Sequence, residues 1–87
     1  MTRIPLLSAH KVIKVLEAAG FQIVSQKGSH IKMKKRTPDS TFVTIIPDHD
    51  EIPVGTLRSI IRQSGMTPEE FLDLSAFLAE SPESGAE

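Results

Sequence analysis

The sequence predicts an α+β fold in which a three-stranded antiparallel sheet is covered on one face by helices. Three short segments rich in β-branched and aromatic residues follow one another between tight turns, as the strands of a meander do. Before and after these segments, apolar residues recur at helical spacing. The predicted order is therefore helix, three strands, helix, helix.

The first helix is expected over residues 9–19. Ser8 is a good N-cap, and Gly20 suits the left-handed residue that ends a helix. Lys11 and Lys14 fall on the outer side, where either solvation or contact with phosphate explains them. The apolar side consists of Val12, Ile13, Leu16 and Ala19.

The three strands are expected over residues 21–25, 30–36 and 41–46. The first two are joined by the tight connection Lys27-Gly28-Ser29, and the last two by Thr37-Pro38-Asp39-Ser40, which has the composition of a β-turn. Short turns between successive strands favour antiparallel pairing of neighbours.

Two further helices are expected over residues 53–64 and 68–79. Pro53 fits the first turn of the former. Thr67 and Glu70 have the spacing of a capping box at the start of the latter.

The length of 87 residues predicts one domain, over residues 1–79, followed by an acidic tail over 80–87 whose composition predicts disorder. The absence of Cys excludes disulfides and thiolate metal sites. No stretch approaches the roughly 20 apolar residues of a membrane span, and no signal peptide is evident. The expected location is the cytoplasm.

Charge is divided along the chain. Residues 1–36 hold eight Lys and Arg and one acid, whereas residues 37–87 hold two Arg and ten acids. The basic part favours a nucleic acid or an acidic partner. The acidic part fits either solvation or a basic partner protein.

Half of the ten Lys and Arg residues lie between Gln26 and Arg36. If residues 30–36 form a strand, alternation turns Ile31 and Met33 towards the core. The other face then carries an imidazole beside three cations: His30, Lys32, Lys34 and Arg36. This pattern indicates either chemistry on a polyanion or a solvated strand edge, and it does not by itself separate the two.

Two stretches resemble the HicA-type (YcfA-like) mRNA interferase toxins. Gln26-Lys27-Gly28-Ser29-His30 is similar to the family's Gly-Ser-His motif. Ile46-Pro47, His49, Glu51-Ile52 and the segment Gly55-Thr56-Leu57-Arg58 through Gly65 are similar to the second half of the family, and the helix start after Met66 also matches. The similarity runs from about Ser8 to Leu74.

The resemblance implies a fold like that of double-stranded-RNA-binding domains. It also implies metal-independent cleavage of RNA without a cofactor, with His30 as the catalytic residue. A HicB-type antitoxin is the implied partner, which binds the toxin and blocks its site. One departure is visible, because the family often has an arginine where this chain has Ser25.

With RNA as substrate, the 2′-OH is the nucleophile and His30 is the expected general base. Whether His30, Lys27 or water protonates the leaving oxygen remains open. The backbone of the Gly28-Ser29 turn is expected to add N–H donors for phosphate. The expected RNA contacts are Lys27, Gly28, Ser29, Lys32, Lys34 and Arg36.

Other interpretations remain beside this one. His49 fits a loop, capping or antitoxin-contact role better than a metal site, since adjacent ligands rarely converge on one ion. Arg58 and Arg62 fit a solvated face or an RNA contact equally. A non-catalytic RNA-binding module is the main alternative function. A DNA-binding helix-turn-helix is disfavoured, because residues 68–79 carry three acids and no Lys or Arg.

Overall fold

The computed structural model describes residues 4–80 of the chain. The predicted α+β class and element order are confirmed. The open antiparallel sheet is consistent with the double-stranded-RNA-binding-like fold. The elements are α1 (Ala9–Ala18), β1 (Gln22–Lys27), β2 (His30–Arg36), β3 (Thr41–Pro47), α2 (Val54–Gln63) and α3 (Pro68–Glu80).

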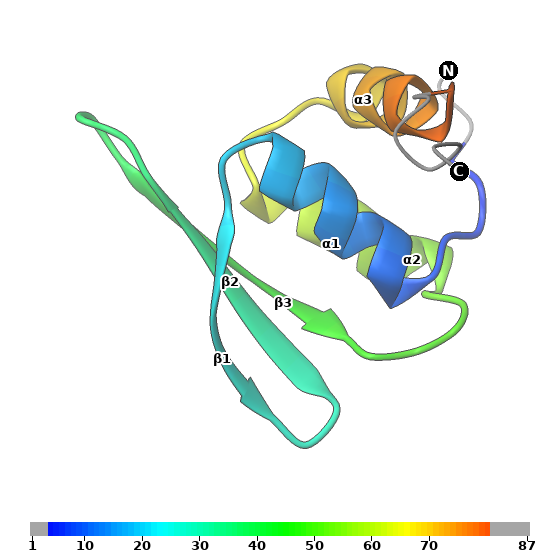
Figure 1. Ribbon diagram of the computed structural model, residues 1–87, viewed down its shortest axis with the longest axis horizontal. Coiled ribbons are helices and arrows are strands. Elements are labelled where there is room, and N and C mark those ends of the chain that lie inside the picture. The colour runs from blue at the N-terminus through cyan, green and yellow to red at the C-terminus, as the bar shows by residue number, and fades with distance from the viewer. Residues whose placement is uncertain (1–3, 81–87) are drawn as a thin grey trace, which may run out of the picture.

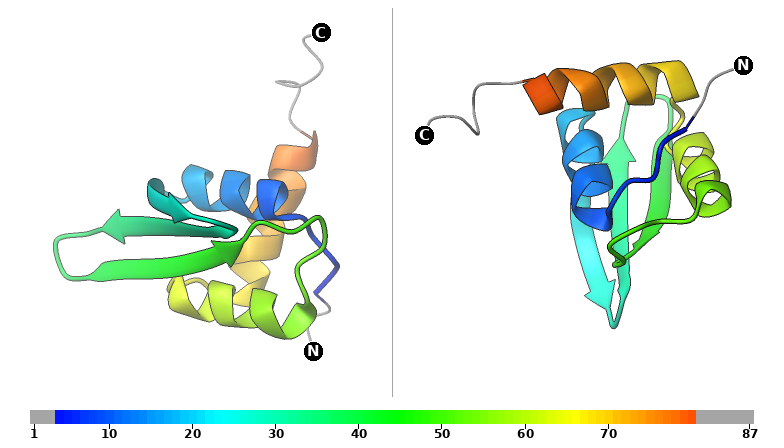
Figure 2. Two further views of the ribbon diagram at one scale, coloured as in Figure 1. Left: turned by 90° about the horizontal axis from the view of Figure 1, so that it is seen from below. Right: turned by 90° about the vertical axis from the view of Figure 1, so that its right-hand side faces the viewer.

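The strands form one antiparallel sheet in the order β1-β2-β3, so β2 is central and the other two are edges. Figure 1 shows α1 and α2 on one side of this sheet. In Figure 2, α3 lies across these two helices. Nothing between residues 4 and 80 covers the opposite side of the sheet, which we call the open face.

The hydrophobic core lies between the helices and the inner side of the sheet. Ile31 and Met33 point inward from β2, and Thr44 and Ile46 do so from β3. Their neighbours in sequence point to the open face, as strand alternation requires. The helices and loops complete the core with Ala9, Val12, Val15, Leu16, Phe21, Ile52, Leu57, Ile60, Ile61 and Phe71, together with Leu7.

The β1–β2 hairpin turns within two residues, Gly28 and Ser29, with Lys27 paired to His30 on either side. Gly28 has a φ of 58°, a left-handed value that tight hairpin turns require and glycine adopts without strain. Because the turn is this short, β1 extends to Lys27 and not only to residue 25. The strand begins after Phe21, which is buried in the core.

A β-bulge interrupts β1. Ile23 pairs with Met33 and Ser25 pairs with Lys32, so Val24 is the extra residue between them. Bulges bend and twist an edge strand and interrupt its regular pairing. No pattern in the sequence predicts this bulge, which depends on how β1 lies against β2.

The predicted caps are present. The Lys11 N–H donates to Ser8 Oγ over 3.2 Å at the start of α1. At α3, the Glu70 N–H donates to Thr67 Oγ1 over 3.0 Å, and the Thr67 N–H donates to Glu70 Oε1 over 2.8 Å. These reciprocal bonds form a capping box, which satisfies backbone donors that the helix itself leaves unpaired.

The helix boundaries differ slightly from those expected. Pro53 is the N-cap of α2, with an extended ψ of 144°, and not part of its first turn. The last helix runs to Glu80, the first residue of the expected acidic tail. The rest of that tail lies outside the described residues. Over residues 4–80, no helix is long and apolar enough to cross a membrane.

Candidate functional site on the open face of the sheet

Cations, all exposed except the half-buried Lys34, gather on the open face along β1 and β2. The set comprises Lys27, Lys32, Lys34 and Arg36, and with His30 we call it the basic strip. No Asp or Glu occurs between residues 18 and 38 to neutralise it along the chain. The structure therefore brings the expected charged site residues onto one face, as the alternation predicts.

The strand register places these side chains next to one another. Residues directly paired across an antiparallel ladder point to the same face, with Cβ atoms about 4.5–5.5 Å apart. Lys27 pairs with His30, and Ser25 pairs with Lys32. On the other side of β2, Ile45 pairs with Lys32.

These residues line a shallow pocket of about 360 Å³, which we call the His30 pocket. All three strands contribute to it. The lining consists of Ser25 and Lys27 from β1, His30 and Lys32 from β2, and Ile45 from β3. An exposed imidazole flanked by two ammonium groups can take or give a proton while the cations hold an anion.

The backbone around His30 is restrained from both sides. The glycine turn and its pairing with Lys27 fix one side. On the other side, His30 pairs with Pro47, and the adjacent Asp48 N–H donates to the Ser29 carbonyl over 2.7 Å. The imidazole is thus exposed, but the backbone that carries it is held in place by hydrogen bonds on both sides. This combination suits a catalytic side chain.

The basic strip continues past this pocket. A second depression of about 500 Å³ is lined by Lys34 and Arg36 together with Gly20, Gln22 and Val24. Lys35 lies outside the strip, since it points to the inner side and its Nζ is 6.0 Å from the centroid of the Phe21 ring. The strip therefore runs along β2, with one depression at each end.

The turn residues expected to contact RNA have structural roles as well. The Ser29 carbonyl accepts the bond from Asp48, and the Gly28 carbonyl accepts one from Gln26 Nε2 over 3.4 Å. Neither Gly28 nor Ser29 lines the His30 pocket. Ser29 belongs to the turn, which agrees with its interpretation as a turn residue.

The acidic loop after β3 connects the site to α1. The His49 carbonyl accepts the Ala9 N–H over 2.9 Å, and the Ile52 N–H donates to the Leu7 carbonyl over 2.8 Å. The His49 side chain is exposed. In the described part of the chain, no three His, Cys, Asp or Glu side chains form a group suited to a metal ion.

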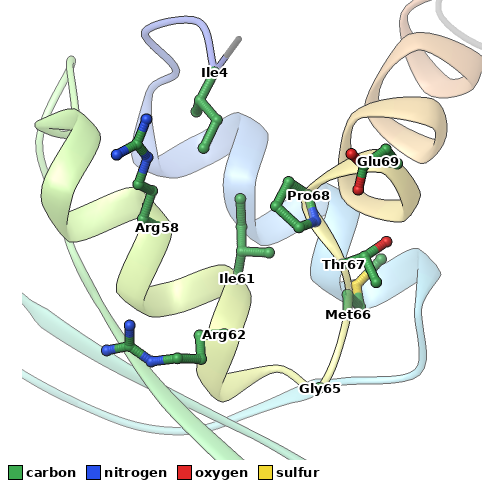
Figure 3. A pocket seen from close by; sticks show the side chains of 9 residues that line it. All are labelled: Ile4, Arg58, Ile61, Arg62, Gly65, Met66, Thr67, Pro68 and Glu69. Carbon is green, nitrogen blue, oxygen red and sulfur yellow. The ribbon is translucent and has the colours of Figure 1, made fainter. Parts of the chain in front are cut away.

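Arg58 and Arg62 lie apart from the basic strip. They line a groove of about 720 Å³ between α2 and the start of α3, with Ile4, Ile61 and Met66 among its apolar residues. Figure 3 shows both arginines projecting from α2 at the edge of this groove. The groove is larger than the His30 pocket, but it contains no imidazole. The open face, by contrast, combines a titratable group with several cations.

Of the pocket residues, the sequence identified Ser25 only as a departure from the family and gave no role to Ile45. Ile45 looks like an ordinary strand residue, but it is 49% exposed on the open face. The signal was available in the turn at residues 37–40. With Arg36 and Thr41 on either side of that turn, continued antiparallel pairing brings residue 45 opposite residue 32.

Fold and site together define a small α+β protein whose open sheet face is suited to a polyanion. The family described as the HicA toxin of bacterial toxin-antitoxin systems matches residues 9–66, about two thirds of the chain. The chain belongs to this family, so it is the toxin of a toxin–antitoxin pair and an antitoxin is its partner. No curated protein matches it.

Proposed function

We propose that this toxin is an mRNA interferase, a metal-independent endoribonuclease that uses His30 as its general acid–base group. The observation that carries the proposal is the exposed His30 imidazole in a pocket flanked by Lys27 and Lys32. RNA is the substrate class that combines a dense negative charge with an internal nucleophile, the 2′-OH. The expected place of action is the cytoplasm, with mRNA as the target.

In the proposed reaction, the His30 imidazole removes the proton of a ribose 2′-OH. The 2′-oxygen then forms a bond to the adjacent phosphorus, and the bond from phosphorus to the 5′-oxygen breaks. The leaving 5′-oxygen takes a proton, so the products are a 2′,3′-cyclic phosphate and a 5′-OH end. General acid–base help of this kind contributes roughly 10²–10⁴-fold to a rate.

The cations supply the electrostatic part of this mechanism. Lys27 and Lys32 lie within the pocket and hold the phosphate as charge builds on its oxygens. Lys34 and Arg36 bind phosphates further along the strand. N–H groups of Gly28 and Ser29 add donors at the turn. Lys27 is the nearest candidate for the general acid, because it pairs directly with His30.

Contacts to the RNA backbone dominate in this proposal. β1 and β2 contain no Phe, Tyr or Trp, and the one such residue of β3, Phe42, points to the inner side against Gly65. Stacking on aromatic side chains is a main way in which proteins hold single-stranded bases. The open face instead offers cations, which bind phosphate irrespective of base.

A HicB-type antitoxin completes the proposal. Such a partner neutralises the toxin by binding to it and blocking access to His30. No small-molecule cofactor takes part.

The test compares wild-type protein with His30→Gln on a mixed-sequence RNA in the presence of EDTA. Glutamine retains hydrogen bonding and approximate size but has no titratable group. We expect the wild type to cut the RNA and the variant to be inactive, with equal unfolding midpoints because the side chain is exposed. If neither protein cuts but both retard the RNA on a gel, the chain is a non-catalytic RNA-binding module. Activity that requires a divalent metal contradicts the metal-free mechanism.

A further inference from the structure

The free edge of β3 is unprotected. β3 is one edge of the sheet, and its seven residues, Thr41–Pro47, include no charged side chain and no bulge, while the single proline stands at the last position and leaves the rest of the edge open. The other edge, β1, has both a lysine and a bulge at Val24. Proteins commonly use charges and bulges to prevent an edge strand from pairing with another chain. The sheet is thus protected at β1 and open to pairing at β3.

Two hydrogen bonds determine which backbone groups of β3 face the free edge. In an antiparallel ladder, hydrogen-bonded pairs alternate with non-bonded pairs. The Thr37 N–H donates to the Ser40 carbonyl, and the Asp48 N–H donates to the Ser29 carbonyl, at the two ends of the β2–β3 ladder. Counting from either end gives the same alternation: the residues of β3 that are hydrogen-bonded to β2 are Phe42, Thr44 and Ile46. Thr41, Val43 and Ile45 therefore direct their N–H and C=O groups away from β2, towards the free edge.

The side chains beside this edge are uncharged. On the open face, Val43 is 38% and Ile45 49% exposed. On the helix side, a groove of about 440 Å³ separates β3 from α2 and is lined by the polar side chains of Thr56, Ser59 and Gln63. Gln63 Oε1 accepts a 2.9 Å hydrogen bond from Thr44 Oγ1, which ties α2 to the strand. An added strand finds an apolar surface on one side and a neutral polar one on the other.

Ile45 belongs to both surfaces. It lines the groove along the edge, and it also lines the His30 pocket. Neighbouring strands lie about 4.8 Å apart, so a strand added to β3 places its own side chains directly beside Ile45. Side chains of a strand docked at this edge therefore lie next to the His30 pocket.

We propose that the antitoxin docks by adding one of its own β-strands to the free edge of β3. The strand alternates, with apolar side chains beside Val43 and Ile45 and polar ones facing α2. The antitoxin is favoured over a second copy of this chain because the edge is continuous with the pocket that an inhibitor must block. This inference rests on the toxin role in the proposed function, but not on the chemistry assigned to His30.

The decisive variant is Val43→Pro, with Val43→Thr as its matched control. Proline removes the outward N–H and places its ring at the free edge, and since that N–H does not bond β2, the sheet is retained. Threonine is of similar size, keeps the N–H and suits a strand. The affinity of each variant and of the wild type for the cognate antitoxin is measured by titration calorimetry. We expect Val43→Pro to weaken binding at least about tenfold and Val43→Thr to stay within about threefold.

Hydrogen exchange tests the same inference without a substitution, and it decides the matter if Val43→Pro does not fold. The Val43 and Ile45 amides face the free edge, so they should exchange fast in the free protein and become protected in the complex. Unchanged exchange of both amides on binding, or equal affinity of Val43→Pro and wild type, overturns the proposal. So does a wild-type dimer that Val43→Pro converts to a monomer, because the edge then serves a second copy.

RNA cleavage by the free toxin is recorded separately. If Val43→Pro loses antitoxin binding but the wild-type protein does not cut RNA, docking at the β3 edge is supported and the proposed enzyme activity is refuted. If the wild-type protein cuts RNA but Val43→Pro leaves its affinity for the antitoxin unchanged, the enzyme activity is supported and the docking proposal is refuted. The two proposals therefore fail independently.

Discussion

At the scale of single residues, the site combines a fixed backbone with an exposed side chain. His30 lies between the glycine turn and the bond from Asp48 to Ser29, so its Cα has little freedom. Its imidazole opens into the pocket with Lys27 and Lys32. This division lets the proposed general base meet a substrate without first ordering the chain, which removes an entropic cost from the reaction.

Ser25 is the residue of this pocket whose replacement is most informative. It pairs with Lys32 and lines the pocket, so an arginine there adds a third cation within reach of the same phosphate. We expect Ser25→Arg to bind RNA several-fold more tightly, with a salt dependence steeper by about one phosphate contact. Binding titrations at several salt concentrations measure both quantities.

Ala76→Arg on α3 is the control for this substitution. Ala76 is exposed, so the variant adds the same charge to the molecule away from the open face. If both variants tighten binding equally, total charge and not the pocket governs affinity, and the proposed position of the phosphate is wrong.

At the scale of elements, the connection between α2 and α3 depends on one glycine. Gly65 has a φ of 80°, and a Cβ added there would lie 2.7 Å from Cε1 of Phe42 on β3. Gly28 also has a left-handed φ, but an added Cβ meets nothing within 4 Å. A side chain at either position has the cost of a left-handed backbone conformation, but only at Gly65 does it also clash with a neighbour.

We expect Gly65→Ala to lower the free energy of unfolding by at least about 2 kcal/mol, combining roughly 1–2 kcal/mol for the left-handed conformation with a clash against Phe42. Gly28→Ala should lose only the conformational part. Urea unfolding followed by circular dichroism measures both. Equal losses would mean that Phe42 moves aside at no cost.

The secondary structure could be predicted because its signals are local. Ser8, Thr67 with Glu70, and the two turns each act within a few residues, and all four appear where expected. The alternation in residues 30–36 also predicted the face of each side chain, since burial on one side of a sheet imposes a period of two.

The composition of the pocket was predicted only in part. Ser25 enters it because the first hairpin turn has two residues and not the three expected, which turns Ser25 to the open face. Ile45 enters it through the register that the turn at residues 37–40 imposes on β3. By contrast, the bulge at Val24 and the separation of Arg58 and Arg62 from the strip depend on tertiary packing, which no local pattern in the sequence predicts.

At the scale of the whole molecule, charge is separated in space as well as along the chain. The basic strip occupies the open face, whereas the acids after residue 37 belong mainly to the loop before α2 and to α3. A field of this kind orients a polyanion towards one face and raises the rate of productive encounter. It also predicts that cations in different places contribute unequally to RNA binding.

Two double variants test this prediction, since each removes two lysines and leaves the same net charge. Lys32→Ala with Lys34→Ala removes charge from the basic strip, whereas Lys11→Ala with Lys14→Ala removes it from the exposed side of α1. For single-stranded RNA, each lost phosphate contact should reduce the slope of log K against log salt by about 0.7. We therefore expect the strand variant to lose up to about 1.4 in slope and the helix variant to lose almost none. Equal losses would show that RNA also contacts α1, and a loss confined to the α1 variant would refute the open face as the RNA-binding surface.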